Sequence, residues 1–396
     1  MVTLRTVALA LTLSIVALVA PPVRAATPSG PPIEIQAILS LTGPAAFLGQ
    51  AEQSGLQLVE TQVNSAGGIA GRPLKFIVAD DQTNPQVAVQ LFNGLTSKNV
   101  PLVIGPSLTA TCSAVAALAK DGPLVYCLSP GFHPEKGSWA FSWGPVTTDL
   151  VALNIRYDRE RGWKKIALIT STDASGQDGD HSVDAALALP ENKDVTLVDR
   201  EHYNTSDLSV SAQISKIKES GAQALIAWGT GTPIGTVFHG IADTGLNIPV
   251  GISAGNLTFP LLKQYGSVLP KTLQSAAFAA VAYDALPEGA VKKAAREYTE
   301  AFKAIGVRAD ATQVIGWDPG LIVASAYRKI GPSATAAQLK DYISNLRGFA
   351  GATGMYNFPD VPQRGVDATV TGVMVQWDAG SNSFIAISKF GGALLR

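Results

Sequence analysis

The motif in this sequence most suggestive of catalysis is a Gly-x-Ser-x-Gly pentapeptide. It is written Gly251-Ile-Ser253-Ala-Gly255 and follows a short apolar run. In α/β-hydrolases this motif presents a nucleophilic serine, and the acid and the histidine of the triad follow it along the chain. All four histidines of this sequence precede Ser253. The order of residues therefore disfavours a serine hydrolase, which is kept only as an alternative that would use Ser253.

A second glycine-rich segment, Gly229-Thr-Gly231-Thr-Pro-Ile-Gly235, has some likeness to a dinucleotide-binding loop. Its spacing is one residue too long for Gly-x-Gly-x-x-Gly. Glycines here suit instead a strand-to-helix turn where a ligand approaches the backbone. The sequence also lacks a His-Glu-x-x-His motif, a Walker loop and a cluster of metal ligands. We therefore expect neither a cofactor nor a metal.

Two loops of small residues remain as candidates for binding. Gly105-Pro-Ser-Leu-Thr-Ala-Thr111 follows one strand-like run, and Ser129-Pro-Gly-Phe132 follows the next. Hydroxyls and backbone N–H groups at the start of a helix favour an anion. Ligands of open α/β sheets sit beyond the carboxyl ends of the strands. The two loops together predict a carboxylate site, although Thr109 or Thr111 as an ordinary helix cap would explain the first loop equally well.

The elements that must position these loops alternate regularly. Strand-like runs lie at 33–39, 74–79, 102–104 and 124–128, with helical patterns at 51–64, 87–95 and 113–119 between them. The same alternation restarts at residue 165 and continues to residue 252. Strands that alternate with helices form parallel sheets with right-handed crossovers. The pattern thus predicts an α/β protein with two similar lobes.

The patterns in the chain after residue 280 predict a C-terminal segment that contributes elements to both lobes. Segments 290–305 and 319–330 have helical periodicity, and segments 370–377 and 384–388 have the pattern of two antiparallel strands around a turn;. Residues 141–146 have the character of a crossing segment. We expect the tail to return to the first lobe and to finish on the second.

The first 25 residues have the features of a cleaved secretory signal peptide. Arg5 precedes an apolar stretch from Val7 to Ala20, and Val23-Arg24-Ala25 offers small residues for cleavage;. The stretch is too short for a membrane anchor, which needs about 20 apolar residues. No cysteine lies near the cleavage position, as a lipoprotein would require. We therefore expect an exported protein.

The composition bears on the possible partners of the protein, and the cysteines bear on its disulfide state. Hydrophobic residues make up 46% of the chain, charged residues 15%, and the formal net charge is -1. No basic run stands out, so nucleic acid is not an expected partner. Cys112 and Cys127 are the two cysteines. In an oxidising compartment such a pair is most simply a disulfide, with two buried free thiols as the alternative.

Several short motifs together resemble the periplasmic binding proteins of branched-chain amino acid ABC transporters. These motifs are Leu41-Thr-Gly-Pro-Ala-Ala-Phe-Leu-Gly49, Asn64-Ser-Ala-Gly-Gly-Ile-Ala-Gly-Arg-Pro-Leu74, Ala79-Asp-Asp-Gln-Thr-Asn-Pro-Gln86, Ile104-Gly-Pro106 and Ser129-Pro130. Their order and spacing carry the resemblance over nearly the whole chain after residue 25. It implies a type I fold with two Rossmann-like lobes, three hinge crossings and a ligand between the lobes. The implied parts are 1–25 as signal peptide, 31–143 plus 281–354 as lobe 1, and 144–280 plus 355–396 as lobe 2.

The resemblance also implies a set of ligand-binding positions. On lobe 1 they are Leu48, Ser107, Leu108, Thr109, Gly131 and Phe132, with Thr109 as the carboxylate-binding hydroxyl and His133 beside the second loop. On lobe 2 they are Ser175, Gln177, Thr230, Gly231, Thr232 and Ser253. The family's acidic partner for an amino acid's ammonium group falls at Ser253, which carries no charge. Asp318 is a candidate to take its place, with capping of the following helix as the alternative.

The loss of an acid at Ser253 favours an aromatic or other organic acid over an amino acid, because a buried ammonium without a partner is costly. Trp317, Phe132 and Trp228 are candidates for stacking on a ring, and each is equally a candidate for the core. The resemblance therefore implies a non-enzymatic, monomeric periplasmic protein that binds a small carboxylate and delivers it to an ABC transporter permease. A branched-chain amino acid binder and a ligand-presenting sensor component are the alternatives.

Overall fold

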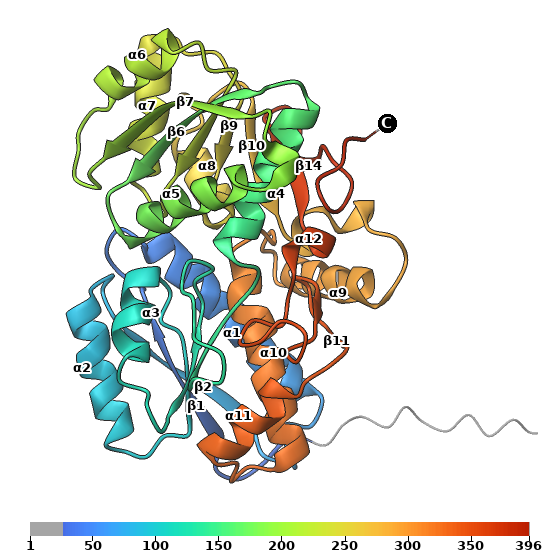
Figure 1. The fold of residues 1–396 in the computed structure, drawn as a ribbon. Coiled ribbons are helices and arrows are strands. Elements are labelled where there is room, and N and C mark those ends of the chain that lie inside the picture. Colours follow the sequence, from blue (N-terminus) through green and yellow to red (C-terminus); the bar gives the residue numbers. More distant parts are fainter. Residues whose placement is uncertain (1–26, 396) are drawn as a thin grey trace, which may run out of the picture.

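The structure is a computed structural model of the 396-residue chain, and it describes residues 27–395. The expected signal peptide, residues 1–25, lies outside the described residues. The chain forms two α/β lobes, one above the other in Figure 1. Each lobe has its own central sheet, of five strands in the lower lobe and seven in the upper one.

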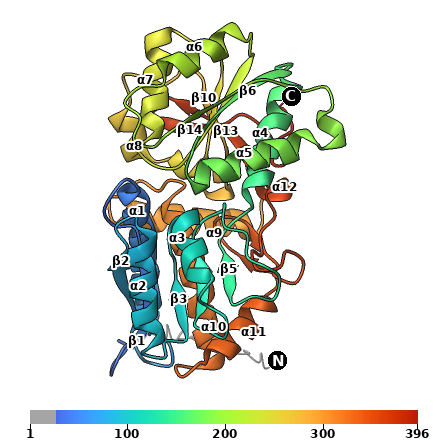
Figure 2. The ribbon, with the colours of Figure 1, turned by 60° about the vertical axis from the view of Figure 1, so that its left-hand side comes forward.

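The sheet of the lower lobe is entirely parallel and has the order β2-β1-β3-β4-β5. Its strands are β1 (Ile33–Leu39), β2 (Leu74–Asp80), β3 (Leu102–Ile104), β4 (Leu124–Cys127) and β5 (Ala140–Ser142). Its helices are α1 (Ala46–Ser65), α2 (Pro85–Thr96), α3 (Thr109–Ala116), α10 (Gln313–Ile330) and α11 (Ala336–Ser344). Helices α2 and α3 pack together on one side, where they share an apolar cluster with β1, β3 and β4 (Figure 2). Because helices cover the strands, β3 and β4 are buried along their whole length;.

Helices α1 and α10 cross at unusually close range on the lower lobe. A Cβ added at Gly316 would lie 2.1 Å from the backbone oxygen of Glu52, and one added at Gly55 would lie 2.2 Å from that of Gln313. Glycine at both positions lets the two backbones touch. This contact explains why α10 begins at Gln313 rather than at Pro319, the expected start, since the helix is held against α1 before the proline.

The sheet of the upper lobe has the order β14-β13-β10-β9-β8-β6-β7. Its strands are β6 (Lys165–Ser171), β7 (Thr196–Tyr203), β8 (Ala224–Trp228), β9 (Val250–Ile252), β10 (Leu273–Ala277), β13 (Val373–Asp378) and β14 (Ser383–Ala386). Its helices are α4 (Thr147–Glu160), α5 (Ala174–Leu187), α6 (Ser211–Glu219), α7 (Ile234–Thr244) and α8 (Phe259–Gln264). Strands β13 and β14 are antiparallel and close one edge, as the tail pattern predicts. Strand β10 was not anticipated from the sequence.

The chain passes between the lobes three times. It leaves the lower lobe after β5, returns after β10, and leaves again after the short strands β11 (Phe349–Ala350) and β12 (Met355–Tyr356). The second passage leads through a 3-10 helix (Ala279–Ala285) and α9 (Ala290–Ala304) to α10, and the third leads through α12 (Ala368–Thr371) to β13. The three passages agree with the expected architecture, while the boundaries at 143, 280 and 354 stay a prediction.

The two cysteines are free thiols, so the expected disulfide is wrong and the alternative holds in this structure. Both side chains are fully buried in the cluster beneath α2 and α3. The Cys112 thiol donates a hydrogen bond to the carbonyl of Pro106 at 3.2 Å. Burial raises the pKa of the Cys127 thiol well above its usual value, which disfavours the reactive thiolate;.

Across residues 27–395, none of the helices has both the length and the apolar character needed to cross a membrane. The same residues contain no group of three or more histidine, cysteine, aspartate or glutamate side chains placed to hold a metal ion.

Candidate functional site

A cavity of about 50 Å³ lies between the two lobes, at the carboxyl ends of the parallel strands of both sheets. Loops after β3 and β4 line it from below, and loops after β6, β8, β9 and β10 line it from above. Its lining residues are Leu48, Ser107, Leu108, Thr109, Leu128, Ser129, Pro130, Gly131, Trp143, Thr147, Leu150, Ser175, Asp178, Trp228, Thr230, Ser253, Ala254, Gly255, Phe278 and Ile315. The position is the one that open α/β sheets provide for ligands.

The lower wall combines a helix start with two hydroxyls. Thr109 is the first residue of α3, and its Oγ1 shares a hydrogen bond of 2.8 Å with Oγ of Ser129. The first backbone N–H groups of a helix have no partners within the helix and carry partial positive charge. The two loops singled out in the sequence are thus brought together, in an arrangement that suits a carboxylate.

Ser107 lines the cavity, but its hydroxyl already has partners within the protein. Its Oγ donates to Oε2 of Glu52 at 2.5 Å and accepts from the backbone N–H of Ser40 at 3.1 Å. Glu52 is fully buried, and burial raises the pKa of its carboxyl well above the usual value. Ser107 therefore fixes the loop before α3 to α1 and β1.

Gly131 is the residue of the second loop at which space is tightest. A Cβ added there would lie 2.7 Å from Oγ1 of Thr109 and 2.8 Å from Oδ2 of Asp178. Only glycine lets these two oxygens approach the backbone this closely. The neighbouring Phe132 points away, into the apolar cluster beneath α2 and α3, so its ring does not line the cavity.

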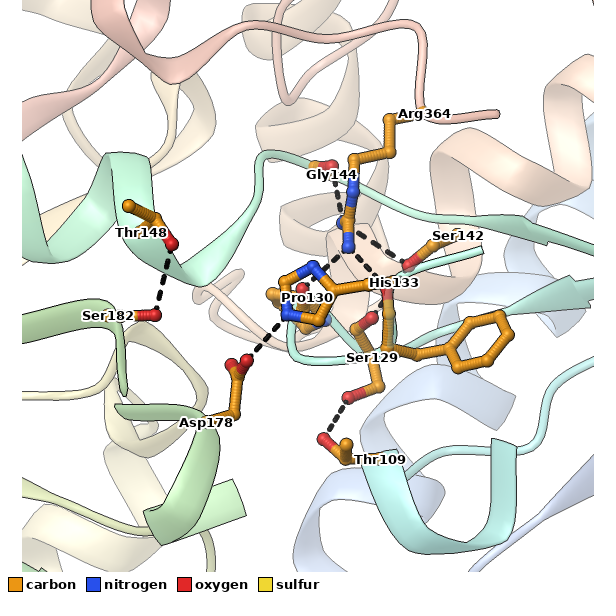
Figure 3. A network of polar contacts seen from close by, with 11 residues as sticks. Thr109, Ser129, Pro130, His133, Ser142, Gly144, Thr148, Asp178, Ser182 and Arg364 are labelled. Carbon is orange, nitrogen blue, oxygen red and sulfur yellow. Dashed lines mark hydrogen bonds and ion pairs between the residues drawn. The ribbon is translucent and has the colours of Figure 1, made fainter. Parts of the chain in front are cut away.

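A buried arginine, which the sequence gave no reason to single out, holds this loop from behind. Arg364 lies on the third passage, and its guanidinium donates to the carbonyls of Pro130, Phe132 and Gly144 and to Oγ of Ser142 (Figure 3). Burial lowers its pKa to about 10, so the group stays charged at neutral pH. No periodic or motif pattern surrounds Arg364, because the segment is neither helix nor strand.

The upper wall is built from short polar side chains. Ser175 and Thr230 share a hydrogen bond of 2.8 Å between their hydroxyls, and Oγ of Ser253 donates to the carbonyl of Gly229 at 2.9 Å. The other residues expected on this lobe, Gln177, Gly231 and Thr232, do not line the cavity and make hydrogen bonds within the upper lobe instead. The Gln177 amide donates to the carbonyl of Thr172, the N–H of Gly231 donates to Oδ1 of Asn256, and the carbonyl of Thr232 accepts from the Tyr265 hydroxyl.

Apolar side chains complete the cavity, and three of them are aromatic. Trp143, Trp228 and Phe278 line it together with aliphatic residues of both lobes. Trp228 was among the expected stacking residues. Trp317, which was expected too, does not line the cavity. The centroid of the Trp317 ring lies 5.6 Å from that of the Tyr298 ring, in the apolar core.

Asp318 does not line the cavity either. Its carboxylate accepts hydrogen bonds from the N–H groups of Ala352 and Thr353, at 2.9 and 2.8 Å, and from the Tyr356 hydroxyl at 3.1 Å. These bonds fix the loop between β11 and β12 to α10. Asp318 is therefore placed neither to bind an ammonium group in the cavity nor to cap the helix that follows it.

One ion pair joins the lobes across the cavity rim. Nε2 of His133, on the second loop of the lower lobe, lies 2.5 Å from Oδ1 of Asp178 on α5 of the upper lobe (Figure 3). The histidine side chain is 51% exposed and the aspartate side chain 12% exposed. Oδ2 of Asp178 is buried and has no hydrogen-bond partner. Asp178 was not singled out from the sequence, since nothing near it in the chain marks it as facing the other lobe.

Ser253 is poorly placed for nucleophilic catalysis. Its hydroxyl donates to a backbone carbonyl, and no histidine, lysine or arginine is among the described residues that line the cavity. A serine nucleophile needs an adjacent general base. The geometry thus agrees with the sequence order in disfavouring a hydrolase.

Comparisons with known proteins agree with this architecture. A family model described as periplasmic binding protein matches residues 32–382. The leucine-, isoleucine-, valine-, threonine- and alanine-binding protein of Pseudomonas aeruginosa is 23% identical over 233 residues, which are 55% of this chain and 60% of that protein. Leu/Ile/Val-binding protein homolog 1 of Brucella suis is 26% identical over 245 residues, 60% of this chain and 64% of that protein. These matches span less than two thirds of each relative.

Solved structures match over more of the chain. An extracellular ligand-binding receptor from Rhodopseudomonas palustris HaA2 has a TM-score of 0.79 and 22% identity, covering 90% of this chain and 100% of that one. LivJ of Streptococcus pneumoniae, solved in complex with isoleucine, has a TM-score of 0.74 and 20% identity, covering 90% and 99%. These likenesses confirm the type I fold with its two parallel-sheet lobes. Together with the family match over most of the described residues, they establish that the chain belongs to the periplasmic binding protein family.

Proposed function

We propose that this protein is the extracytoplasmic solute-binding component of an ABC importer, and that it clamps a small carboxylate between its two lobes. The observation that carries the proposal is the cavity between the lobes, with a helix start and paired hydroxyls on one wall and apolar side chains around it. A ligand in this cavity would touch both lobes at once. Its binding would therefore stabilise the closed form, which a permease can recognise.

The carboxylate would lie at the start of α3. There the Thr109 and Ser129 hydroxyls and the first N–H groups of the helix can donate hydrogen bonds to it;. The positive charge of Arg364 lies just behind the loop that contains Pro130 and Phe132. All these features favour negative charge on the ligand at this end of the cavity.

The rest of the ligand would be apolar and is proposed to be aromatic. Trp143, Trp228 and Phe278 offer ring surfaces, and Leu128 and Leu150 offer aliphatic contacts. Aromatic pairs add about 0.5–1.5 kcal/mol beyond the burial of their area. The periplasmic location, the permease partner and the monomeric state belong to the same proposal and are supported by membership of the family.

The relatives support a second candidate, a branched-chain amino acid ligand, because their names include leucine, isoleucine and valine binding. A sensor component that presents the ligand to a membrane receptor would use the same cavity. Identifying the membrane protein that binds the closed form, a receptor or a permease, distinguishes sensing from transport. Binding measurements on the isolated protein are enough to identify the ligand.

A thermal-shift screen tests the proposal. The protein is unfolded and refolded to remove bound ligand, and aromatic acids, aliphatic acids and branched-chain amino acids are compared. A ligand at 100 times its Kd adds about 2.7 kcal/mol to the free energy of unfolding, which gives a clear rise of the midpoint. We expect carboxylates with an apolar group to raise it.

Thr109→Val should weaken binding of these ligands about tenfold, because a hydrogen bond to a charged group is lost. Ser113→Ala, at an exposed position on the same helix, is the matched control and should leave affinity unchanged. If no carboxylate raises the midpoint, or if Thr109→Val binds as well as the unaltered protein, the carboxylate site at α3 is wrong.

A further inference from the structure

A buried acid lies directly behind the lower wall of the cavity. Glu52, on α1, is fully buried, and its Oε2 lies 2.5 Å from Oγ of Ser107, a residue that lines the cavity. The other oxygen of the carboxyl, Oε1, is also buried and has no hydrogen-bond partner. An ionised carboxylate in these surroundings would be costly, so they favour the neutral acid.

The groups packed around Glu52 favour the neutral form as well. Burial is the main cause that raises the pKa of Glu52; it outweighs the opposing effect of the Ser107 bond, and a second acid, Asp81, adds to the rise. Helix α10 approaches Glu52 with the backbone of Gly316. The acid of that helix, Asp318, is bound by N–H groups of the loop between β11 and β12.

The state of Glu52 decides what the Ser107 hydroxyl can do. This hydroxyl has one proton to donate and can accept two, and it accepts from the N–H of Ser40 at 3.1 Å;. If Glu52 is ionised, Ser107 must donate its proton to Oε2, and none is left for a ligand. If Glu52 is neutral, its own O–H can donate to Ser107, because an O–O distance of 2.5 Å suits a proton on either oxygen;. The Ser107 proton is then free for a partner in the cavity.

We propose that Glu52 supports ligand binding as a neutral acid, which donates its proton to Ser107 and so frees the Ser107 hydroxyl to donate to the ligand's carboxylate. The proposal rests on the proposed function and adds a positioning residue that does not itself touch the ligand. It gives the carboxylate a further donor beside Thr109 and Ser129. It also keeps a second negative charge away from the ligand.

Ligand binding is then linked to the proton on Glu52. Because a raised pKa means that the acid is neutral at low pH, affinity is full there and falls as the pH rises through the pKa of Glu52;. The negative charge of a bound carboxylate favours the neutral acid further. Where Glu52 is ionised in the free protein, binding therefore takes up a proton.

The competing role for Glu52 is purely structural, as an ionised acceptor that holds the loop before α3 through Ser107. The two roles predict different results. An ionised Glu52 uses the Ser107 proton, so removal of the Ser107 hydroxyl costs the ligand no hydrogen bond. A neutral Glu52 makes that hydroxyl a ligand donor, and glutamine, whose amide can donate to Ser107 and cannot ionise, is able to replace it.

The experiment combines calorimetry with infrared spectroscopy on the full protein. Calorimetry gives the affinities of 3-phenylpropanoate, 4-methylpentanoate and leucine from pH 6 to pH 10 for the unaltered protein, Glu52→Gln and Ser107→Ala. Glu34→Gln, at an exposed carboxyl on β1 of the same lobe, is the matched control. The infrared difference between the unaltered protein and Glu52→Gln, with ligand bound at pH 7, shows whether Glu52 contributes the carbonyl band of a protonated carboxyl. Circular dichroism confirms that each variant is folded.

We expect the protonated band in the unaltered protein and about the same affinity for Glu52→Gln, Glu34→Gln and the unaltered protein at pH 6. Ser107→Ala should bind about 10- to 100-fold more weakly, because a hydrogen bond to a charged group is lost. Once Glu52 ionises at higher pH, the affinity of the unaltered protein should fall relative to that of Glu52→Gln. The same titration of other groups, such as His133, affects both proteins and cancels in this ratio.

Absence of the protonated band, or a ratio that rises with pH, would show that the ionised form serves binding and would overturn the inference. So would a Ser107→Ala variant that binds as tightly as the unaltered protein. These outcomes leave the proposed function intact. If Ser107→Ala does not fold, the infrared band and the ratio to Glu52→Gln decide. Failure of all three ligands to bind would overturn the proposed function, and the inference with it.

Discussion

Asp158, in α4, has a fully buried carboxyl, and its protonation affects the stability of the folded state. Its Oδ1 accepts from the Gln274 amide at 2.6 Å, while Oδ2 has no partner. Burial raises its pKa to about 7, against about 3.9 in an unfolded chain;. The folded state therefore binds the proton more tightly than the unfolded state. The resulting contribution to stability is fully present below about pH 4 and is lost as the pH rises through about 7.

Asp158→Asn should remove this dependence, because asparagine stays neutral and keeps the oxygen that Gln274 contacts. The free energy of unfolding of the variant, relative to the unaltered protein, should rise between pH 4 and pH 7 by a few kcal/mol and then level off. Urea titrations at several pH values measure it. The control is Asp194→Asn, an exposed carboxyl whose pKa is lowered by its bond to Lys164, so that no such rise is expected. A difference for Asp158→Asn that is constant from pH 4 to pH 8 would contradict the assignment.

At the scale of elements, Arg364 joins the third passage to segments that lie 220 to 234 residues earlier in the sequence. Its guanidinium binds the loop after β4, the end of β5 and the start of the first passage between the lobes, from its own place on the third passage. These segments have little regular structure, so the hydrogen bonds of the arginine replace those that a sheet or helix would supply. The ligand loop is thereby fixed to the hinge.

Arg364→Met should destabilise the protein by about 2–4 kcal/mol, because a side chain of similar length leaves several buried acceptors without donors. Urea unfolding measures the change. Arg347→Met is the matched control, since Arg347 and its partner Asp360 are both exposed. This control should stay within about 0.5 kcal/mol of the unaltered protein. Equal stability of the two variants would show that the buried guanidinium does not hold the hinge.

The sequence predicts elements well where periodicity decides them and poorly where long-range contacts do. The alternating strands and helices and the antiparallel pair β13–β14 follow from local patterns of apolar residues. The early start of α10 depends on its contact with α1, which no local pattern reveals. Likewise, the free thiols reflect where α3 and β4 place two side chains, and composition alone cannot decide that.

The candidate site was predictable in part for the same reason. Gly131 and Thr230 lie on loops that follow strands, and Thr109 and Ser175 lie at the starts of the helices α3 and α5. The structure brings all four to one cavity. Trp317 and Asp318 lie within α10, where packing against neighbouring helices and the β11–β12 loop decides their contacts. The pairing of His133 with Asp178 depends on how one lobe meets the other, and no stretch of sequence contains that information.

For the whole molecule, the two lobes and their three connections predict motion about a hinge. One lobe lies above the other in Figure 2. They meet across the cavity, and the pair of His133 and Asp178 spans its rim. Because the histidine is half exposed, the pair contributes no more than about 1 kcal/mol. Closure must therefore be driven mainly by the ligand, with the pair as a minor aid.

His133→Ala should accordingly lower ligand affinity by no more than about fivefold. It should also leave the ligand-free protein somewhat more open. Small-angle X-ray scattering measures this as a larger radius of gyration, which should fall again to the value of the unaltered complex when ligand saturates the variant. A variant that stays open at saturation would mean that the pair, and not the ligand, closes the lobes.

The burial of both native thiols has a practical consequence. Cys112 and Cys127 are the only cysteines of the chain, and neither side chain is exposed. A cysteine introduced at an exposed position such as Gln177, close to the rim, would be the one thiol that a maleimide dye can reach in the native protein. The colour or brightness of that dye would then report the approach of the opposite lobe, so the protein can be turned into a fluorescent reporter of its own solute without replacing any native residue in its core.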